Sequence, residues 1–102
     1  MDNHSVPTTI PTAVTIAGIT FDRIVYDREA DVLYLHVGEP SSAVDFDATN
    51  EGHHMRYGPD GTIVGITIVN ARRILEEDGE IAITLPRQRV VVKDLESVLA
   101  AA

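Results

Sequence analysis

The chain has 102 residues, of which 44% are hydrophobic and 24% charged, which is the size and composition of one globular domain rather than of a disordered chain. Sixteen acidic against eight basic residues give a formal net charge of −8, which excludes broad non-specific nucleic-acid binding because such binding needs an excess of Lys and Arg. The absence of cysteine excludes disulfides, thiolate metal sites and cysteine nucleophiles.

The first segment, residues 1–13, is polar and contains two prolines, which predicts a flexible N-terminal arm. It has no Lys or Arg and no apolar run of the kind found in export signals. No segment approaches the ~18 consecutive apolar residues of a membrane span. We therefore expect a cytoplasmic protein in which residues 14–102 form a single domain.

Alternating and β-branched residues predict a series of strands between residues 14 and 69. They are expected at residues 14–19, 23–26, 31–37, 42–47, 53–57 and 62–69. The sequence Gly-Pro-Asp-Gly at 58–61 predicts a hairpin turn before the last of them. This last strand is apolar at nearly every position, which is typical of a central strand covered on both faces.

The remainder of the chain predicts two helices that flank two further strands. Asn70 is expected to cap a helix over 71–78, and Gly79 to end it. Strands are expected at 81–85 and 89–93, with their place relative to the main sheet left open, and Asp94 is expected to cap a terminal helix carrying Leu95, Val98 and Leu99 on one side. The predicted class is α+β: an antiparallel β-meander with a short helix after the central strand and a C-terminal helix packed on the sheet.

Two segments resemble a known family. Residues 26–35, Tyr-Asp-Arg-Glu-Ala-Asp-Val-Leu-Tyr-Leu, are similar to the Y-D-x-E-A-D-x-L-Y-I opening of the domain of unknown function 2283 family. Residues 61–71 are similar to its D-G-x-V-V-G-I-E-I … D-A close, although Thr67 stands where the family usually has Glu. The resemblance implies a compact β-rich domain, association with other small proteins in some members, and no activity, cofactor or catalytic residue.

One acidic cluster lies between the second and third expected strands. Asp27, Glu29 and Asp31 carry the oxygen ligands that a hard cation such as Ca²⁺ or Mg²⁺ prefers. Turn chemistry explains the same residues, because an Asp side chain hydrogen-bonds to nearby backbone amides. The turn is the favoured interpretation.

A second cluster supplies the candidate metal ligands Asp45, Asp47, His54 and His36, together with Glu51 and His53. A hairpin of residues 42–47 and 53–57 would bring a carboxylate and an imidazole close together, a ligand pair that suits zinc, manganese or iron. Because neighbouring residues of a strand point to opposite faces, only one of His53 and His54 is able to join the site. A solvated histidine beside acidic residues is the favoured alternative.

No motif for covalent or phosphate chemistry is present. The only triad that we consider, Ser41 or Ser42 with His36 and Asp45, is a composition that small domains acquire by chance. Neither a nucleophile elbow nor a glycine-rich phosphate loop occurs. We expect no catalytic residue and no cofactor.

The expected function is that of a non-enzymatic interaction domain. Val32, Tyr34 and Val69 lie opposite the first core set and predict a homodimer, and the acidic surface predicts a basic protein partner, as in an antitoxin-like role. The alternative is a small metal-binding protein or metal-assisted hydrolase that uses the 45–54 hairpin. A third hypothesis is a small ligand between sheet and helices, bound by Tyr34 or Tyr57.

Overall fold

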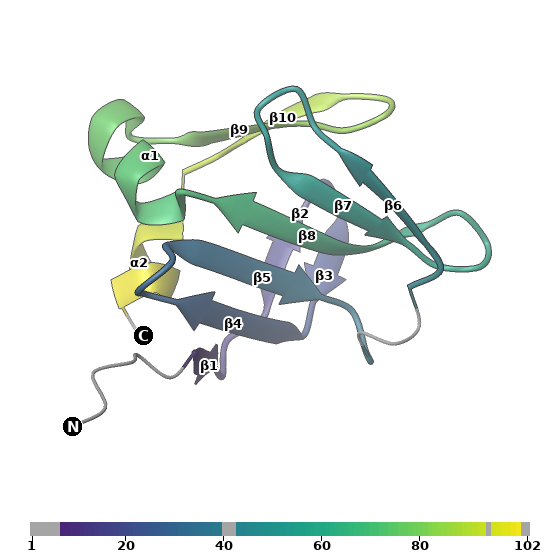
Figure 1. Cartoon of the computed structure of the whole chain (residues 1–102), viewed down its shortest axis with the longest axis horizontal. Coiled ribbons are helices and arrows are strands. Elements are labelled where there is room, and N and C mark those ends of the chain that lie inside the picture. Colours follow the sequence, from purple (N-terminus) through teal and green to yellow (C-terminus); the bar gives the residue numbers. More distant parts are fainter. Residues whose placement is uncertain (1–6, 40–42, 94, 101–102) are drawn as a thin grey trace.

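A six-stranded antiparallel sheet forms the front of the molecule in Figure 1. The computed structural model describes residues 7–39, 43–93 and 95–100. The order of the strands in the sheet is β1-β4-β5-β8-β7-β6. Their bounds are β1 (Thr8–Ile10), β4 (Arg23–Asp27), β5 (Val32–His36), β6 (Asp45–Ala48), β7 (His54–Tyr57) and β8 (Ile63–Val69).

The remaining elements are two hairpins and two helices; Figure 1 shows the first hairpin behind the sheet and the first helix beyond the end of the central strand. They are the hairpin of β2 (Val14–Ile16) and β3 (Ile19–Phe21), the hairpin of β9 (Ile81–Thr84) and β10 (Arg89–Val92), and the helices α1 (Ala71–Asp78) and α2 (Leu95–Ala100). Two helices and mostly antiparallel strands confirm the predicted α+β class.

The core lies between the large sheet and these rear elements. Alternate residues of the large sheet point backward and are almost fully buried: Ile24, Tyr26, Leu33, Leu35, Met55, Ile66 and Ile68. They join buried residues of the hairpins and helices in one cluster that includes Phe21, Leu75, Ile81, Ile83, Leu95 and Leu99. Since all the covering elements lie on one side, no element among the described residues covers the other face of the sheet.

The position of β8 differs in part from the prediction. As expected, it is a central strand, but it inserts between β5 and β7, so the chain does not form a meander in sequence order. Within the described residues of one chain, only one of its two faces is covered. Ile66 and Ile68 reach the core, whereas Thr67 and Val69 lie half-buried on the open face.

The N-terminal region is more ordered than the sequence predicts. Residues 8–10, expected to belong to the flexible arm, form β1 on β4, and Ile10 is 2% exposed because it packs into the core opposite Ile24. Residues 1–6 of that arm lie outside the described residues. The single strand expected at 14–19 is wrong: Ala17 and Gly18 adopt φ of 54° and 80° and turn the chain between β2 and β3.

The C-terminal third follows its local signals. Gly79 ends α1 at φ 75°, as predicted, and its amide donates to the Leu75 carbonyl. β9 pairs with β10 in a separate two-stranded sheet, which settles the place of these strands. Leu95, Val98 and Leu99 are the buried side of α2, whereas its expected cap, Asp94, lies outside the described residues. Among the residues that are described, no helix is long and apolar enough to cross a membrane.

The start of α1 is capped from a distant part of the chain. Asn70, the predicted cap, has a φ of 59° and makes no side-chain hydrogen bond to the helix. Asp31 takes this role: its Oδ1 accepts the Arg72 amide at 2.8 Å and its Oδ2 accepts the Arg73 amide at 3.1 Å. The Asp31 carbonyl accepts the Ala71 amide at 3.2 Å. The acidic turn therefore satisfies three of the helix's first amides.

Tyr26 completes this connection from within the core. Its hydroxyl donates to Asp31 Oδ1 at 2.7 Å, and the Arg72 guanidinium lies 5.6 Å from the centre of its ring. Partial burial alone would raise the pKa of Asp31, but the bonds from the Tyr26 hydroxyl and the helix amides bring that pKa below its ordinary value. The carboxylate is therefore ionised and positioned at the positive end of α1.

Replacing Asp31 with Ala is predicted to lower the free energy of unfolding by about 2–3 kcal/mol, since a helix cap is lost and a buried hydroxyl loses its acceptor. The urea midpoint measures this loss. Asn70→Gly is the control: glycine tolerates the positive φ and no cap is removed, so the free energy of unfolding stays within about 0.5 kcal/mol of wild type. Equal effects of the two substitutions would contradict the assignment of the cap to Asp31.

Candidate open-face site

The outer surface of the large sheet, which we call the open face, is built from alternate residues of its strands. The pairing register arranges them in rows that cross the sheet. One row contains Arg23, His36, Gly65 and Arg56; the next contains Thr9, Val25, Tyr34, Thr67 and His54; the third contains Asp27, Val32 and Val69. Residues directly opposite each other in a row lie ~5 Å apart, so each row is a continuous line of contacts.

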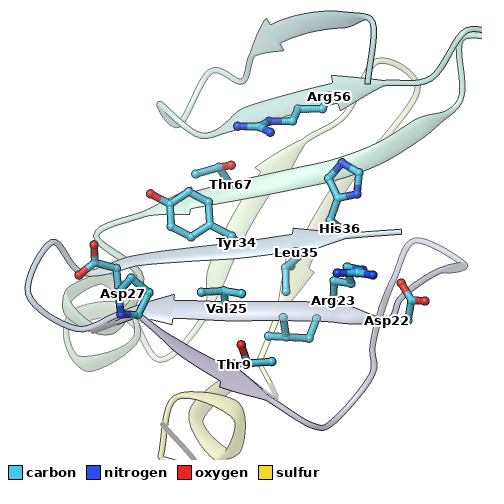
Figure 2. A pocket seen from close by; sticks show the side chains of 12 residues that line it. Thr9, Asp22, Arg23, Val25, Asp27, Tyr34, Leu35, His36, Arg56 and Thr67 are labelled. Atoms are coloured by element: carbon cyan, nitrogen blue, oxygen red, sulfur yellow. The ribbon is translucent and has the colours of Figure 1, made fainter. Parts of the chain in front are cut away.

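A hollow of about 500 Å³ lies on the open face. Figure 2 shows its side chains, with Tyr34 near the middle, Arg23 and Asp27 at opposite ends of β4, and Arg56 and Thr67 on the far side. Tyr34 is 38% exposed and stands among the half-buried Val25 and Thr67.

His36 is the one buried ionisable side chain of this hollow. The residue is 6% exposed, and its Nδ1 lies 3.0 Å from the Val37 carbonyl and 3.3 Å from the Gly38 carbonyl. Both neighbours are acceptors, so Nδ1 donates and Nε2 is left as an acceptor in the neutral ring. Nε2 is buried and has no hydrogen-bond partner among the described residues.

Gly65 makes room for the imidazole. It lies directly opposite His36 on β8, and a Cβ at this position would be 2.8 Å from His36 Cδ2. A side chain at residue 65 is therefore incompatible with this position of the ring. The glycine therefore allows the imidazole to lie against β8.

The charges around the hollow balance locally. Arg23 donates to Glu39 at 2.8 Å, and Arg56 lies 5.6 Å from the centre of the Phe46 ring. Asp22 and Asp27 are the acidic residues of the lining, against Arg23 and Arg56 as its basic residues. The two acidic and two basic residues of the lining thus balance, in a chain whose formal net charge is −8.

Both edges of the sheet are protected against pairing with another strand. On β6, the Phe46 amide donates to Asp45 Oδ1 at 2.9 Å and the Ala48 amide to Asp47 Oδ1 at 2.8 Å, so carboxylates cover amides that a neighbouring strand would need. On the other side, β1 has three residues between Pro7 and Pro11. Strand addition is therefore disfavoured at either edge.

The predicted metal ligands do not converge. Asp45 and Asp47 pair with Tyr57 and Met55. His54 pairs with Ala48, and the alternation of a strand places it and His36 on the face opposite to the two aspartates. Among the described residues, no group of three or more His, Asp and Glu side chains is arranged to hold a metal ion.

Glu51 and His53 have structural contacts. Glu51 accepts the Thr84 amide and hydroxyl at 2.8 and 2.6 Å, which links the β6–β7 loop to β9. Desolvation raises the pKa of Glu51, but the hydrogen bonds from Thr84 outweigh it and lower this pKa from 4.5 to about 2. His53 is 1% exposed; its Nδ1 accepts the Val69 amide at 3.2 Å and burial lowers its pKa.

The remaining candidates have simple outcomes. The acidic turn forms as favoured, since Asp27 Oδ1 accepts the Ala30 amide at 3.1 Å and Asp31 caps α1. The serines of the weak triad, Ser41 and Ser42, lie outside the described residues. Sequence reasoning missed the placement of His36 over Gly65, for which the only signal is a glycine inside an apolar strand.

These observations define a class: a small α+β domain with one covered and one open sheet face. A family model described as "Protein of unknown function (DUF2283)" matches residues 23–72, from β4 to the first turn of α1. The chain belongs to this family, as its two motifs predict. The matched region contains Tyr26, Asp31 and the start of α1, which are the parts of the helix cap. No curated protein and no solved structure matches the chain.

Acid is predicted to destabilise the fold in two separate pH ranges. Burial lowers the pKa of His53, so below pH ~6.5 the unfolded chain takes up a proton that the folded chain does not. The free energy of unfolding therefore decreases as the pH is lowered through this range. Because the folded pKa of Glu51 is about 2, its contribution is complete above its ordinary pKa of 4.5 and is lost as the pH falls towards 2.

Urea midpoints measured from pH 8 to pH 3 separate the two groups. His53→Gln is expected to weaken the pH dependence of the free energy of unfolding between pH 7 and 5 and to leave it unchanged at lower pH. Glu51→Gln is expected to weaken this dependence only below pH ~4.5. A His53→Gln variant with the full wild-type slope above pH 5 would contradict the burial of a neutral ring.

Proposed function

We propose that this chain is a small non-enzymatic interaction module that self-associates through its open face. The observation that carries the proposal is the composition of this face. An antiparallel sheet with one solvated face normally presents polar residues there. Here the centre of the face carries Val25, Val32, Tyr34, Thr67 and Val69, and Tyr34 is 38% exposed.

Charge supports self-association at this face. Two copies of a chain with net charge −8 repel each other unless the joined surfaces lack the excess acid. The open face meets this condition, since Arg23 and Arg56 balance Asp22 and Asp27 around the hollow.

The protected edges favour one mode of association. Dimers of β-proteins often extend a sheet through its edge strand, but the amides of β6 are bonded to Asp45 and Asp47 and β1 is short. For the large sheet the remaining mode is face to face, in which two sheets pack ~10 Å apart and interdigitate their side chains. Such an interface covers Tyr34, an aromatic residue of the type that contributes most to interface stability.

An acidic surface away from the open face suits a basic protein partner. The second half of α1 exposes Glu76, Glu77 and Asp78 to solvent. A dimer presents this surface twice. This agrees with an antitoxin-like role, in which an acidic protein binds to the surface of a basic protein. Salt would release a partner held this way, because exposed charges more than ~8 Å apart are screened at physiological ionic strength.

Light scattering after gel filtration tests the self-association directly. At tens of micromolar the wild-type chain is expected to have twice the monomer mass. Tyr34→Asp places a charge in the interface and is expected to raise the dissociation constant at least tenfold. Val91→Asp is the matched control, because Val91 on β10 is 40% exposed and lies off the large sheet, so this variant stays dimeric.

Unfolding midpoints of both variants confirm that each is folded, since both substitutions are at exposed positions. A wild-type chain that remains monomeric up to 100 µM, or a loss of dimer that is equal in the two variants, would contradict the proposed function.

A further inference from the structure

We propose that the two copies stack with their β4 strands antiparallel, so that Arg23 of each copy pairs with Asp27 of the other. The proposal rests on the proposed self-association and adds the orientation of the second copy. Arg23, Val25 and Asp27 are alternate residues of β4 and share the open face. Figure 2 shows Arg23 and Asp27 at the two ends of this strand with Val25 between them.

The spacing on β4 has the symmetry that a two-fold interface requires. A strand rises ~3.3 Å per residue, so Arg23 and Asp27 each lie ~6.6 Å from Val25 along the strand. A two-fold axis that passes beside Val25 and crosses the strands exchanges the two ends. It places Arg23 opposite Asp27 of the second copy and, by the same operation, Asp27 opposite Arg23.

The rest of the open face agrees with this axis. The row that contains Val25 also contains Tyr34 and Thr67, so these residues meet their own copies at the centre of the interface. The row of Arg23 and His36 then faces the row of Asp27 and Val32. The aromatic ring lies in the middle and the ion pairs lie to either side, which is the usual arrangement of a stable interface.

The other simple orientation is less favourable. An axis that runs along β5 stacks β4 of one copy on β8 of the other, because these strands are the two neighbours of β5. Asp27 would then face Val69, and the two His36 rings would face each other. Covering a carboxylate with an apolar side chain removes its hydration without supplying a cation, which disfavours this orientation.

Contacts within each copy leave the two partners able to form these pairs. Arg23 already binds Glu39, but both side chains are more than half exposed, and an exposed pair of this kind contributes little. A guanidinium has five donors and is able to contact both carboxylates. Asp27 Oδ1 accepts the Ala30 amide, and a carboxylate has about four acceptor positions.

A charge swap tests this orientation. Arg23→Glu and Asp27→Arg are each expected to place two like-charge pairs across the interface. Each variant alone should therefore have a dissociation constant at least tenfold larger than that of the wild type, and should dissociate at a concentration at which the wild type is dimeric. An equimolar mixture of the two variants restores opposite charges at both contacts. Native mass spectrometry is expected to show the one-to-one heterodimer in preference to either homodimer.

Two controls keep the test decisive. Arg89→Glu makes the same change of charge at an exposed position on β10 and is expected to leave the dimer intact. If Asp27→Arg does not fold because the bond to the Ala30 amide is lost, the comparison of Arg23→Glu with Arg89→Glu still tests the contact.

The outcomes separate this inference from the function on which it rests. Single variants that stay dimeric beside a dimeric wild type, or a mixture without heterodimer, would overturn the orientation and leave self-association standing. A monomeric wild type would overturn both.

Discussion

The carboxylate of Asp31 connects the two halves of this fold. It binds the first amides of α1 and the hydroxyl of Tyr26, and Arg72, 41 positions along the chain, donates one of those amides. α1 follows directly after β8, which pairs with β5, so the cap fixes the helix against the turn between β4 and β5. This contact holds α1 behind the sheet, and the chain that continues from it adds β9, β10 and α2 to the same side.

The family motifs take on a structural meaning from this contact. Tyr26, Asp31 and Ala71 all lie within the matched region, and each belongs to the cap or packs beside it. The motifs therefore report how the domain is closed. The open face is formed by alternate residues of the same strands, where Arg23, Val25 and Tyr34 point away from the core.

Local signals in the sequence predicted the local structure. Sequence patterns were enough to predict the Asp-Gly turn at 60–61, the end of α1 at Gly79 and most strands. Each of these features depends on a few neighbouring residues. The turn at Ala17–Gly18 was missed because an alanine at positive φ is an uncommon turn residue.

Contacts between distant segments were beyond the same reasoning. The capping of α1 by Asp31 joins residues that no local pattern connects, so the adjacent Asn70 was predicted in its place. The candidate metal ligands depended on the register of β6 and β7, and a shift of one residue moves every side chain to the other face of a sheet. The observed register puts Asp45 and Asp47 on one face and His54 on the other.

The account depends on one claim: the open face is the surface through which the protein meets its second copy. A dilution series followed by methyl NMR tests it residue by residue. The account predicts that the methyl signals of Val25, Val32 and Val69 shift when the chain is diluted from a concentration at which light scattering gives the dimer mass to one at which it gives the monomer mass, whereas those of Val91 on β10 and of Ile81 in the core stay fixed. Constant signals at these three valines, or shifts confined to Val91, would contradict it.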